Sequence, residues 1–195
     1  MLQIFLSSSV AAIMLSVLFI IISPKLEYHH KNYPTEVHRT IYVDRNLDNW
    51  RLEEIISAAI EWHEATKGLV TFDVEKLPQD NIDPNNSLIM IEITPDFPEI
   101  IIMENKNHNL ILGFYNNENG WPYIALVTSR LDENDFKSVV LHELGHSLGL
   151  EHNKGVNGIG SLMYPSIEGA ATHITNRDLD NFCKLYKCDS KKLYH

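Results

Sequence analysis

The chain has 195 residues, of which 44% are hydrophobic and 22% charged, as expected for a globular protein with one sizeable core. Its net charge is -10, from 16 Lys and Arg against 26 Asp and Glu. No window gathers five or six basic residues, so the sequence lacks the electrostatic footprint of a phosphate-binding surface. We therefore expect a single folded unit with no nucleic-acid partner.

Residues 1–24, MLQIFLSSSVAAIMLSVLFIIISP, carry no ionisable side chain and are apolar except for serines and one glutamine. Their length lies between a long signal-peptide core and a minimal spanning helix of roughly 17 to 25 residues. A cut after Ser23 would place Ile21 where a small residue is preferred, with Pro24 just beyond the cut. We predict an uncleaved membrane anchor, with a cleaved signal segment as the alternative, followed by a polar linker over residues 25–35.

The first ordered elements are predicted from periodicity. Residues 36–43, EVHRTIYV, alternate and are rich in β-branched and aromatic side chains, which is typical of a half-buried strand. Residues 50–68 follow a turn and place apolar side chains at helical spacing, so they predict an amphipathic helix that ends at Gly68. The predicted apolar stripe consists of Leu52, Ile55, Ile56, Ala59, Ile60 and His63.

Four further short stretches rich in strand-forming residues are separated by clusters of turn residues. They are LVTFDV (69–74), SLIMIEI (87–93), LILGFY (110–115) and YIALVTS (123–129). Five strands and one helix are therefore predicted before the segment that carries chemistry.

That segment is VLHELGHSLGLEH, on a helix that is capped by residues within 132–136 and predicted to end at Gly149. His142 and His146 are four residues apart, so both imidazoles project from one face at a spacing that can bind the same metal ion. Gly149 permits a sharp turn, after which His152 can approach the ion from another side. Three neutral imidazoles with a fourth position left to water form the ligand set of a catalytic zinc site.

Glu143 directly follows the first histidine, which turns its carboxylate toward the open side of the metal. We predict that Glu143 is the general base that takes a proton from the zinc-bound water and later protonates the leaving amine. Amide hydrolysis is the expected reaction. The bare H-E-x-x-H motif can arise by chance, but the full H-E-x-x-H-x-x-G-x-x-H on a helix that ends at the glycine is far more demanding.

A third helix is predicted from a capping box, TNRD, with Thr175 as the cap and Asp178 three residues on. It runs to about Leu185. Residues 189–195 are predicted to be a polar C-terminal tail.

HELGHSLGLEH followed by SLMYP resembles the metzincin clan of zinc endopeptidases, and specifically its matrixin (matrix metalloprotease) branch. AIEWHEATKGLVTFDV, LIMIEI and ITNRDLDNFCKLY also resemble matrixin segments, so we place the domain at residues 36–188. The resemblance implies a zincin-like α+β fold, with three helices and a twisted five-stranded mixed sheet whose edge strand is antiparallel. The sequence patterns alone predict only mixed α and β structure.

The resemblance also implies roles by position. Met163 matches the Met-turn methionine, which lies under the zinc ligands without binding the ion. Ile167 replaces an aromatic residue in the wall of the pocket for the substrate residue after the scissile bond, and Ser138 matches a residue that partly sets the depth of this pocket. We expect a deep apolar pocket. The implied substrate-binding residues are Leu112, Gly113, Ser138, Pro165 and Ile167.

The chain departs from the family in three places. Matrixins usually carry structural zinc and calcium ions in the loop before the edge strand, but here that loop offers only His108, so one zinc ion is expected. Calcium is left open, without a motif that supports it. Both cysteines follow the zinc motif, so the propeptide cysteine has no counterpart and we expect the enzyme to be made active. Arg177 replaces the first of two family aspartates, which leaves Asp178 alone to support the Met-turn.

The sequence therefore predicts a monomeric zinc metalloendopeptidase that cuts protein or peptide substrates in extended conformation. One alternative is a protein-binding module that retains zinc without turnover, against which the intact Glu143 argues. Another is a zinc hydrolase of small amides, but no charged clamp lies near the motif.

Localisation is predicted from weaker signals. Lys25, Lys31 and Arg39 follow the apolar segment and none precedes it, so the positive-inside rule would place the domain in the cytoplasm. The predicted activity favours an extracytoplasmic domain, either anchored by a single pass or secreted if the segment is cleaved. Cys183 and Cys188 could close a small loop in an oxidising compartment or stay reduced, and the sequence leaves both open.

Overall fold

The computed structural model describes residues 36–78, 83, 85–93, 99–100, 103–104, 110–117 and 120–194. The predicted anchor, the linker and His108 lie outside the described residues. Within the described part, no helix is long and apolar enough to span a bilayer.

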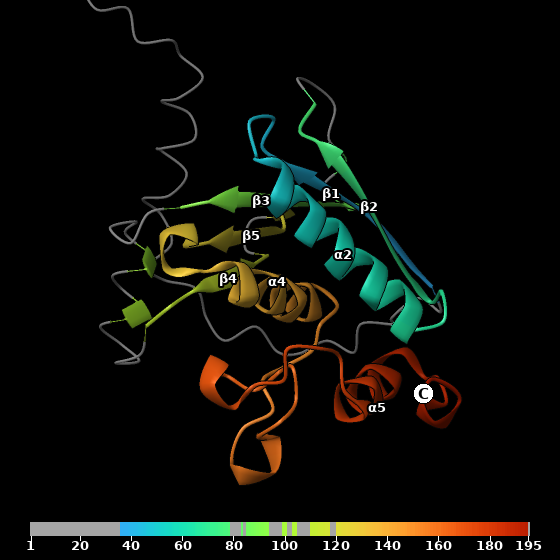
Figure 1. The fold of residues 1–195 in the computed structure, drawn as a ribbon. Coiled ribbons are helices and arrows are strands. Elements are labelled where there is room, and N and C mark those ends of the chain that lie inside the picture. Colours follow the sequence, from blue (N-terminus) through green and yellow to red (C-terminus); the bar gives the residue numbers. More distant parts are fainter. Residues whose placement is uncertain are drawn as a thin grey trace, which may run out of the picture. The chain divides into compact units, whose positions relative to one another are not determined.

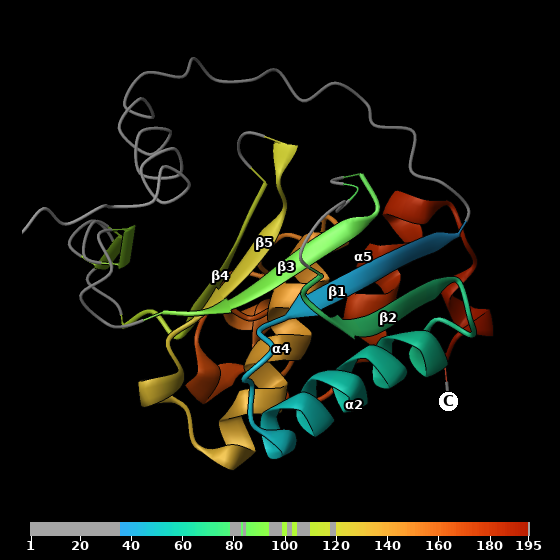
Figure 2. The same ribbon diagram turned by 90° about the horizontal axis from the view of Figure 1, so that it is seen from above.

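A five-stranded sheet forms one layer of the fold. Its strands are β1 (Val37–Val43), β2 (Val70–Lys76), β3 (Ser87–Glu92), β4 (Gly113–Asn116) and β5 (Tyr123–Leu126). Their order is β2-β1-β3-β5-β4, with every pairing parallel except that of β4 with β5 (Figure 2). The predicted mixed sheet with an antiparallel edge strand is confirmed.

Among the described residues, three α-helices complete the α+β fold, as predicted. They are α2 (Asn49–Ala65), α4 (Glu133–Ser147) and α5 (Asn176–Tyr186). Helices α2 and α4 lie side by side on one face of the sheet, where α2 contacts β2 and α4 contacts β4 (Figures 1 and 2). Asp48 and Asp132 cap the N-termini of these two helices by accepting backbone N–H bonds, and Thr175 opens α5 in the predicted capping box.

The main hydrophobic core lies between the sheet and these helices. Alternation along β5 sends Ile124 and Leu126 into this core, while Ala125 and Val127 join a smaller cluster on the other face of the sheet. Trp62 of α2 is fully buried in the main core, and its indole N–H donates to the carbonyl of Leu141 in α4 at 3.1 Å. This bond fixes α2 against the helix that carries the histidines.

The buried face of α2 differs from the predicted stripe. Ile55 and Ala59 are buried as expected, but Ile56 and Ile60 are 38% and 50% exposed. The buried positions are Ile55, Ala58, Ala59, Trp62 and Ala65. Their spacing follows the 3.6-residue period from Ile55 through Trp62, and this large side chain sets the face that turns to the core.

The C-terminal segment is attached to the domain. Cys183 and Cys188 form a disulfide with a Cα–Cα distance of 4.5 Å, which decides between the two states that the sequence left open. Leu193, within the predicted polar tail, is only 4% exposed and packs in the main core.

Candidate metal centre

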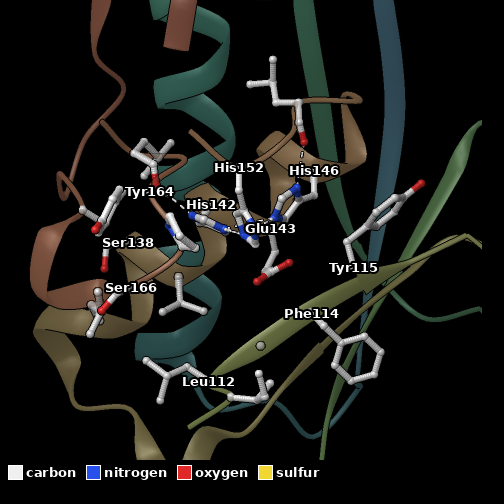
Figure 3. Close-up of a pocket in the computed structure, with 18 of the residues that line it drawn as sticks. Leu112, Phe114, Tyr115, Ser138, His142, Glu143, His146, His152, Tyr164 and Ser166 are labelled. Carbon is white, nitrogen blue, oxygen red and sulfur yellow. Dashed lines mark hydrogen bonds between the residues drawn. The ribbon is translucent and has the colours of Figure 1, made fainter. Parts of the chain in front are cut away.

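The three histidines of the motif meet at the C-terminal half of α4. His142 and His146 stand one turn apart on this helix, which ends at Ser147, two residues before the predicted Gly149. Gly149 follows the helix cap with a φ of 89°, in the left-handed region. The chain then turns back, and the N–H of Leu150 donates to the carbonyl of Gly145 at 3.0 Å. This turn brings His152 against the two helical histidines (Figure 3).

The Nε2 atoms of the three imidazoles form a triangle with sides of 3.1 Å. The Nδ1 atoms of His142 and His146 each lie 2.8 Å from a backbone carbonyl, those of Leu162 and Leu150. A carbonyl can only accept, so each Nδ1 carries the proton and each Nε2 presents a lone pair to the centre of the triangle. Converging lone pairs repel one another unless a cation lies between them, so this donor set fits a metal ion.

The imidazoles have the protonation state that a metal requires. Burial and then the neighbouring His146 lower the pKa of His142 to about 3 and that of His152 to about 4, and burial also lowers the pKa of His146. All three are therefore neutral near pH 7. They are the one group of three or more His, Cys, Asp or Glu in the described residues that could hold a metal ion.

Glu143 lies between the histidines and strand β4 (Figure 3). It is 5% exposed, and its Oε2 atom has no hydrogen-bond partner within the described structure. Burial raises the pKa of Glu143 to about 8, opposed by a hydrogen bond from the backbone N–H of Tyr115 in β4. A buried carboxylate oxygen left without a partner is costly to keep, and such groups occur where a protein uses them in chemistry.

Met163 and Asp178, to which the resemblance assigns supporting roles, both contact the segments that carry or orient these histidines. Met163 is fully buried, and a Cβ on Gly145 would approach its Sδ within 2.5 Å, so only glycine allows this contact. The carboxylate of Asp178 accepts from the N–H groups of Leu162 and Met163 at 2.9 and 3.2 Å. Because the Leu162 carbonyl orients His142, helix α5 is linked to the metal centre through this turn.

A cleft of about 760 Å³ runs past the histidines and Glu143. All five residues predicted to bind substrate line this cleft. Ser138 is among them, and its hydroxyl donates to the Asp135 carbonyl at 2.8 Å, so its polar atom is satisfied within α4. Met103, Tyr115 and Tyr164 also line the cleft and were not predicted from the sequence. For Tyr115 the only signal in the sequence was its place in the edge strand.

Comparisons with known proteins agree with these observations. A family model described as Matrixin matches residues 30–187. Matrix metalloproteinase-16 from Homo sapiens and that from Rattus norvegicus are each 40% identical to this chain over 55 residues, which is 28% of this chain and 9% of theirs. The chain thus matches a small part of these relatives.

Two solved structures are similar at low sequence identity. Archaemetzincin from Methanopyrus kandleri has a TM-score of 0.49 and 15% identity, covering 79% of this chain and 97% of its own. Myroilysin has a TM-score of 0.36 and 14% identity, covering 82% of this chain and 64% of its own.

Proposed function

Because the chain belongs to the matrixin family, we propose that it is a zinc-dependent metalloendopeptidase that acts as a monomer on extended polypeptide substrates. One observation carries this proposal: three histidine Nε2 atoms lie 3.1 Å from one another, beside a buried carboxylate that has an unpartnered oxygen. Three nitrogen donors with an open position are typical of catalytic zinc sites.

Each residue of the centre has a proposed role. His142, His146 and His152 would hold the zinc ion through their Nε2 atoms, and Met163 would support them without binding it. Zinc held there would supply a Lewis acid that lowers the pKa of a coordinated water toward about 7. Glu143 would accept the proton of the attacking water on Oε2 and pass it to the nitrogen of the leaving amine.

The geometry of edge strand β4 supports the proposal that the substrate is a polypeptide. The N–H of Val127 donates to the carbonyl of Leu112 at 2.8 Å, so the main-chain groups of Leu112 face β5. Alternation then turns those of Gly113 and Tyr115 away from β5, and the Tyr115 N–H accordingly reaches Glu143. Gly113 therefore presents its backbone at the sheet edge, where an extended peptide can add as a further strand.

A cleavage assay tests this function. The full chain in detergent is incubated with a random peptide library, and the cleavage sites are read by mass spectrometry. We expect cuts within peptides that disappear on chelation and return with one equivalent of Zn²⁺. Release of terminal residues only would favour a small-amide hydrolase, and uncut peptides with full zinc content would favour the binding module without turnover.

We also propose an extracytoplasmic location, anchored through residues 1–24 or secreted after their removal. The Cys183–Cys188 disulfide supports this location because such bonds persist in oxidising compartments. Protease added to intact cells should digest the domain, whereas protection from that protease would contradict the proposal.

A further inference from the structure

The backbone of Ile111, just before edge strand β4, is held by side chains. The main-chain bond from Val127 to Leu112 extends the ladder of β4 and β5. At the next residue the pattern changes: the N–H of Ile111 donates to Glu104 Oε1 at 2.9 Å, and the Ile111 carbonyl accepts from Arg130 Nη1 at 2.8 Å. Glu104 and Arg130 also form an ion pair with each other.

This three-membered arrangement, the Ile111 clamp, joins Arg130 to two residues that precede it in the chain by 19 and 26 positions. Arg130 belongs to the 3₁₀ turn after β5, Thr128–Arg130, and Glu104 precedes Ile111 by several residues. The side chains of Arg130 and Glu104 are 18% and 25% exposed, so water screens them only partly. The Arg130 hydrogen bond also holds the pKa of Glu104 below its usual value, so the carboxylate is ionised at neutral pH.

The clamp adjoins the cleft. Met103 and Ile111 line the cleft, while the residues joined to them, Glu104 and Arg130, are absent from its lining. Met103 and Ile111 also pack on the small cluster around Phe114. Apolar packing is non-directional, whereas Nη1 of Arg130 donates to both Glu104 and the Ile111 carbonyl, and its two N–H bonds have fixed directions in the guanidinium plane. The ion pair therefore supplies the orientation that packing alone does not.

We propose that Glu104 and Arg130 are positioning residues that hold this wall of the cleft in place for the substrate segment after the scissile bond. The assignment of that segment rests on the proposed function, because Ser138 and Ile167, on the same cleft, were predicted to form the pocket for the residue that follows the cut. Strand β4 meets the catalytic Glu143 through Tyr115, at the other end of the strand. Loss of the clamp should therefore weaken substrate binding more than the chemical step.

The clamp can be tested without an activity assay, by measuring amide hydrogen exchange of the full chain with NMR. In Glu104→Ala we expect the Ile111 amide to exchange about ten-fold faster or more, since its acceptor is gone. Glu75→Gln, on strand β2 at the opposite edge of the sheet, should leave the Ile111 rate unchanged. Unchanged Ile111 exchange in Glu104→Ala would overturn the proposal.

The positioning role is tested with two peptides that share the residues before the scissile bond and carry either one or four residues after it. In Glu104→Gln and Arg130→Met we expect KM for the longer peptide to rise about three- to ten-fold, with kcat within about two-fold. KM for the shorter peptide should change little. Equal losses on both peptides, or a loss confined to kcat, would indicate a general structural effect and contradict the positioning role.

A charge-reversed variant, Glu104→Arg with Arg130→Glu, shows whether the hydrogen bonds to Ile111 matter or whether an ion pair alone is sufficient. It keeps opposite charges in contact but offers a guanidinium to the Ile111 N–H and a carboxylate to the Ile111 carbonyl. We expect no recovery of KM, and recovery to the value of the parent would overturn the clamp. Zinc content should stay near one per chain in all variants. If the parent cleaves neither peptide, the proposed function fails, while the exchange experiment still decides the clamp.

Discussion

Glu143 combines burial with an unpartnered carboxylate oxygen. This arrangement costs stability, and proteins keep it where the carboxylate is needed for chemistry. We predict that Glu143→Ala lowers kcat by several orders of magnitude, because the proton acceptor is lost. Zinc content should stay near one per chain, since the carboxylate is not among the proposed ligands. Kinetics and metal analysis of the same preparation check both statements. Glu133→Ala, an exposed position in the first turn of α4, is the control, and proteolysis retained in Glu143→Ala would contradict the mechanism.

The raised pKa of Glu143 also predicts how the stability of the metal-free protein changes with pH. The pKa of Glu143 is about 8 in the fold against an ordinary 4.5, so between these values the folded state binds more protons than the unfolded chain. Stability should therefore fall as the pH rises through this window, by up to about 1.4 kcal/mol per pH unit.

The three histidines change stability in the opposite direction to Glu143, and they do so at lower pH. Their lowered pKa values make the unfolded chain bind more protons below about 6.5, so they reduce stability only as the pH falls. Denaturant unfolding of chelated protein between about pH 6.5 and 8 isolates Glu143. Glu143→Gln should flatten the slope there, and parallel profiles for variant and parent would show that Glu143 does not titrate in this range.

At the scale of elements, helix α5 matters to the metal centre because its first turn supplies Asp178. This carboxylate is fully buried and accepts from Leu162, Met163 and Thr175. Asp178→Ala leaves these buried donors unpaired, and we expect the free energy of unfolding to fall by about 3 to 5 kcal/mol. The Leu162 carbonyl that orients His142 should then move, so zinc affinity should fall as well.

Removal of a different helix cap is the control for this prediction. Asp132→Ala deletes the N-cap of α4, at the end of that helix away from His146, and should cost about 1 kcal/mol with unchanged zinc affinity. Urea unfolding and competition with a zinc indicator measure the two effects. Equal losses of zinc affinity in both variants would mean that α5 does not orient the ligands.

The elements show which features a sequence can predict. The positions of His142 and His146 depend on local helical spacing, so the pattern alone was sufficient to bring them together. The exposure of Ile56 and Ile60 depends instead on how Trp62 packs between two helices, which no local period contains. The partner of Glu143 is likewise set by strand pairing, because only the antiparallel register of β4 and β5 turns the Tyr115 N–H toward it.

At the scale of the whole molecule, the cleft is assembled from segments that are distant in the chain. Edge strand β4, helix α4 and the residues after Met163 each contribute one side. The family resemblance identified lining residues on all three, whereas the Glu104–Arg130 pair stayed hidden because nothing in either local sequence indicates a partner. Such long-range pairs are fixed by topology.

The pocket that the resemblance implies for the substrate residue after the scissile bond allows a prediction for the assembled cleft. Ser138 is small, and its hydroxyl bonds within α4, so it offers the cleft no free polar group. Large apolar residues should therefore be preferred just after the scissile bond, and Leu, Met or an aromatic side chain should each gain roughly 1.5 to 3 kcal/mol when fully buried. The cleavage sites from the peptide library give this preference directly. A preference for Asp, Lys or Gly at that position would show that the pocket is not apolar.

Substitution at Ser138 then tests whether this residue sets the depth of the pocket. Ser138→Arg would direct a long charged side chain into the space that an aromatic residue must occupy, so kcat/KM for aromatic peptides should fall by at least about ten-fold, the equivalent of roughly 1.4 kcal/mol. Peptides with Ala at that position should be cleaved almost as before, because they do not reach the depth that the new side chain fills. Ser138→Ala removes only the hydroxyl and should keep the preference of the parent. If Ser138→Arg processed large aromatics as well as the parent, Ser138 would not form the end of the pocket.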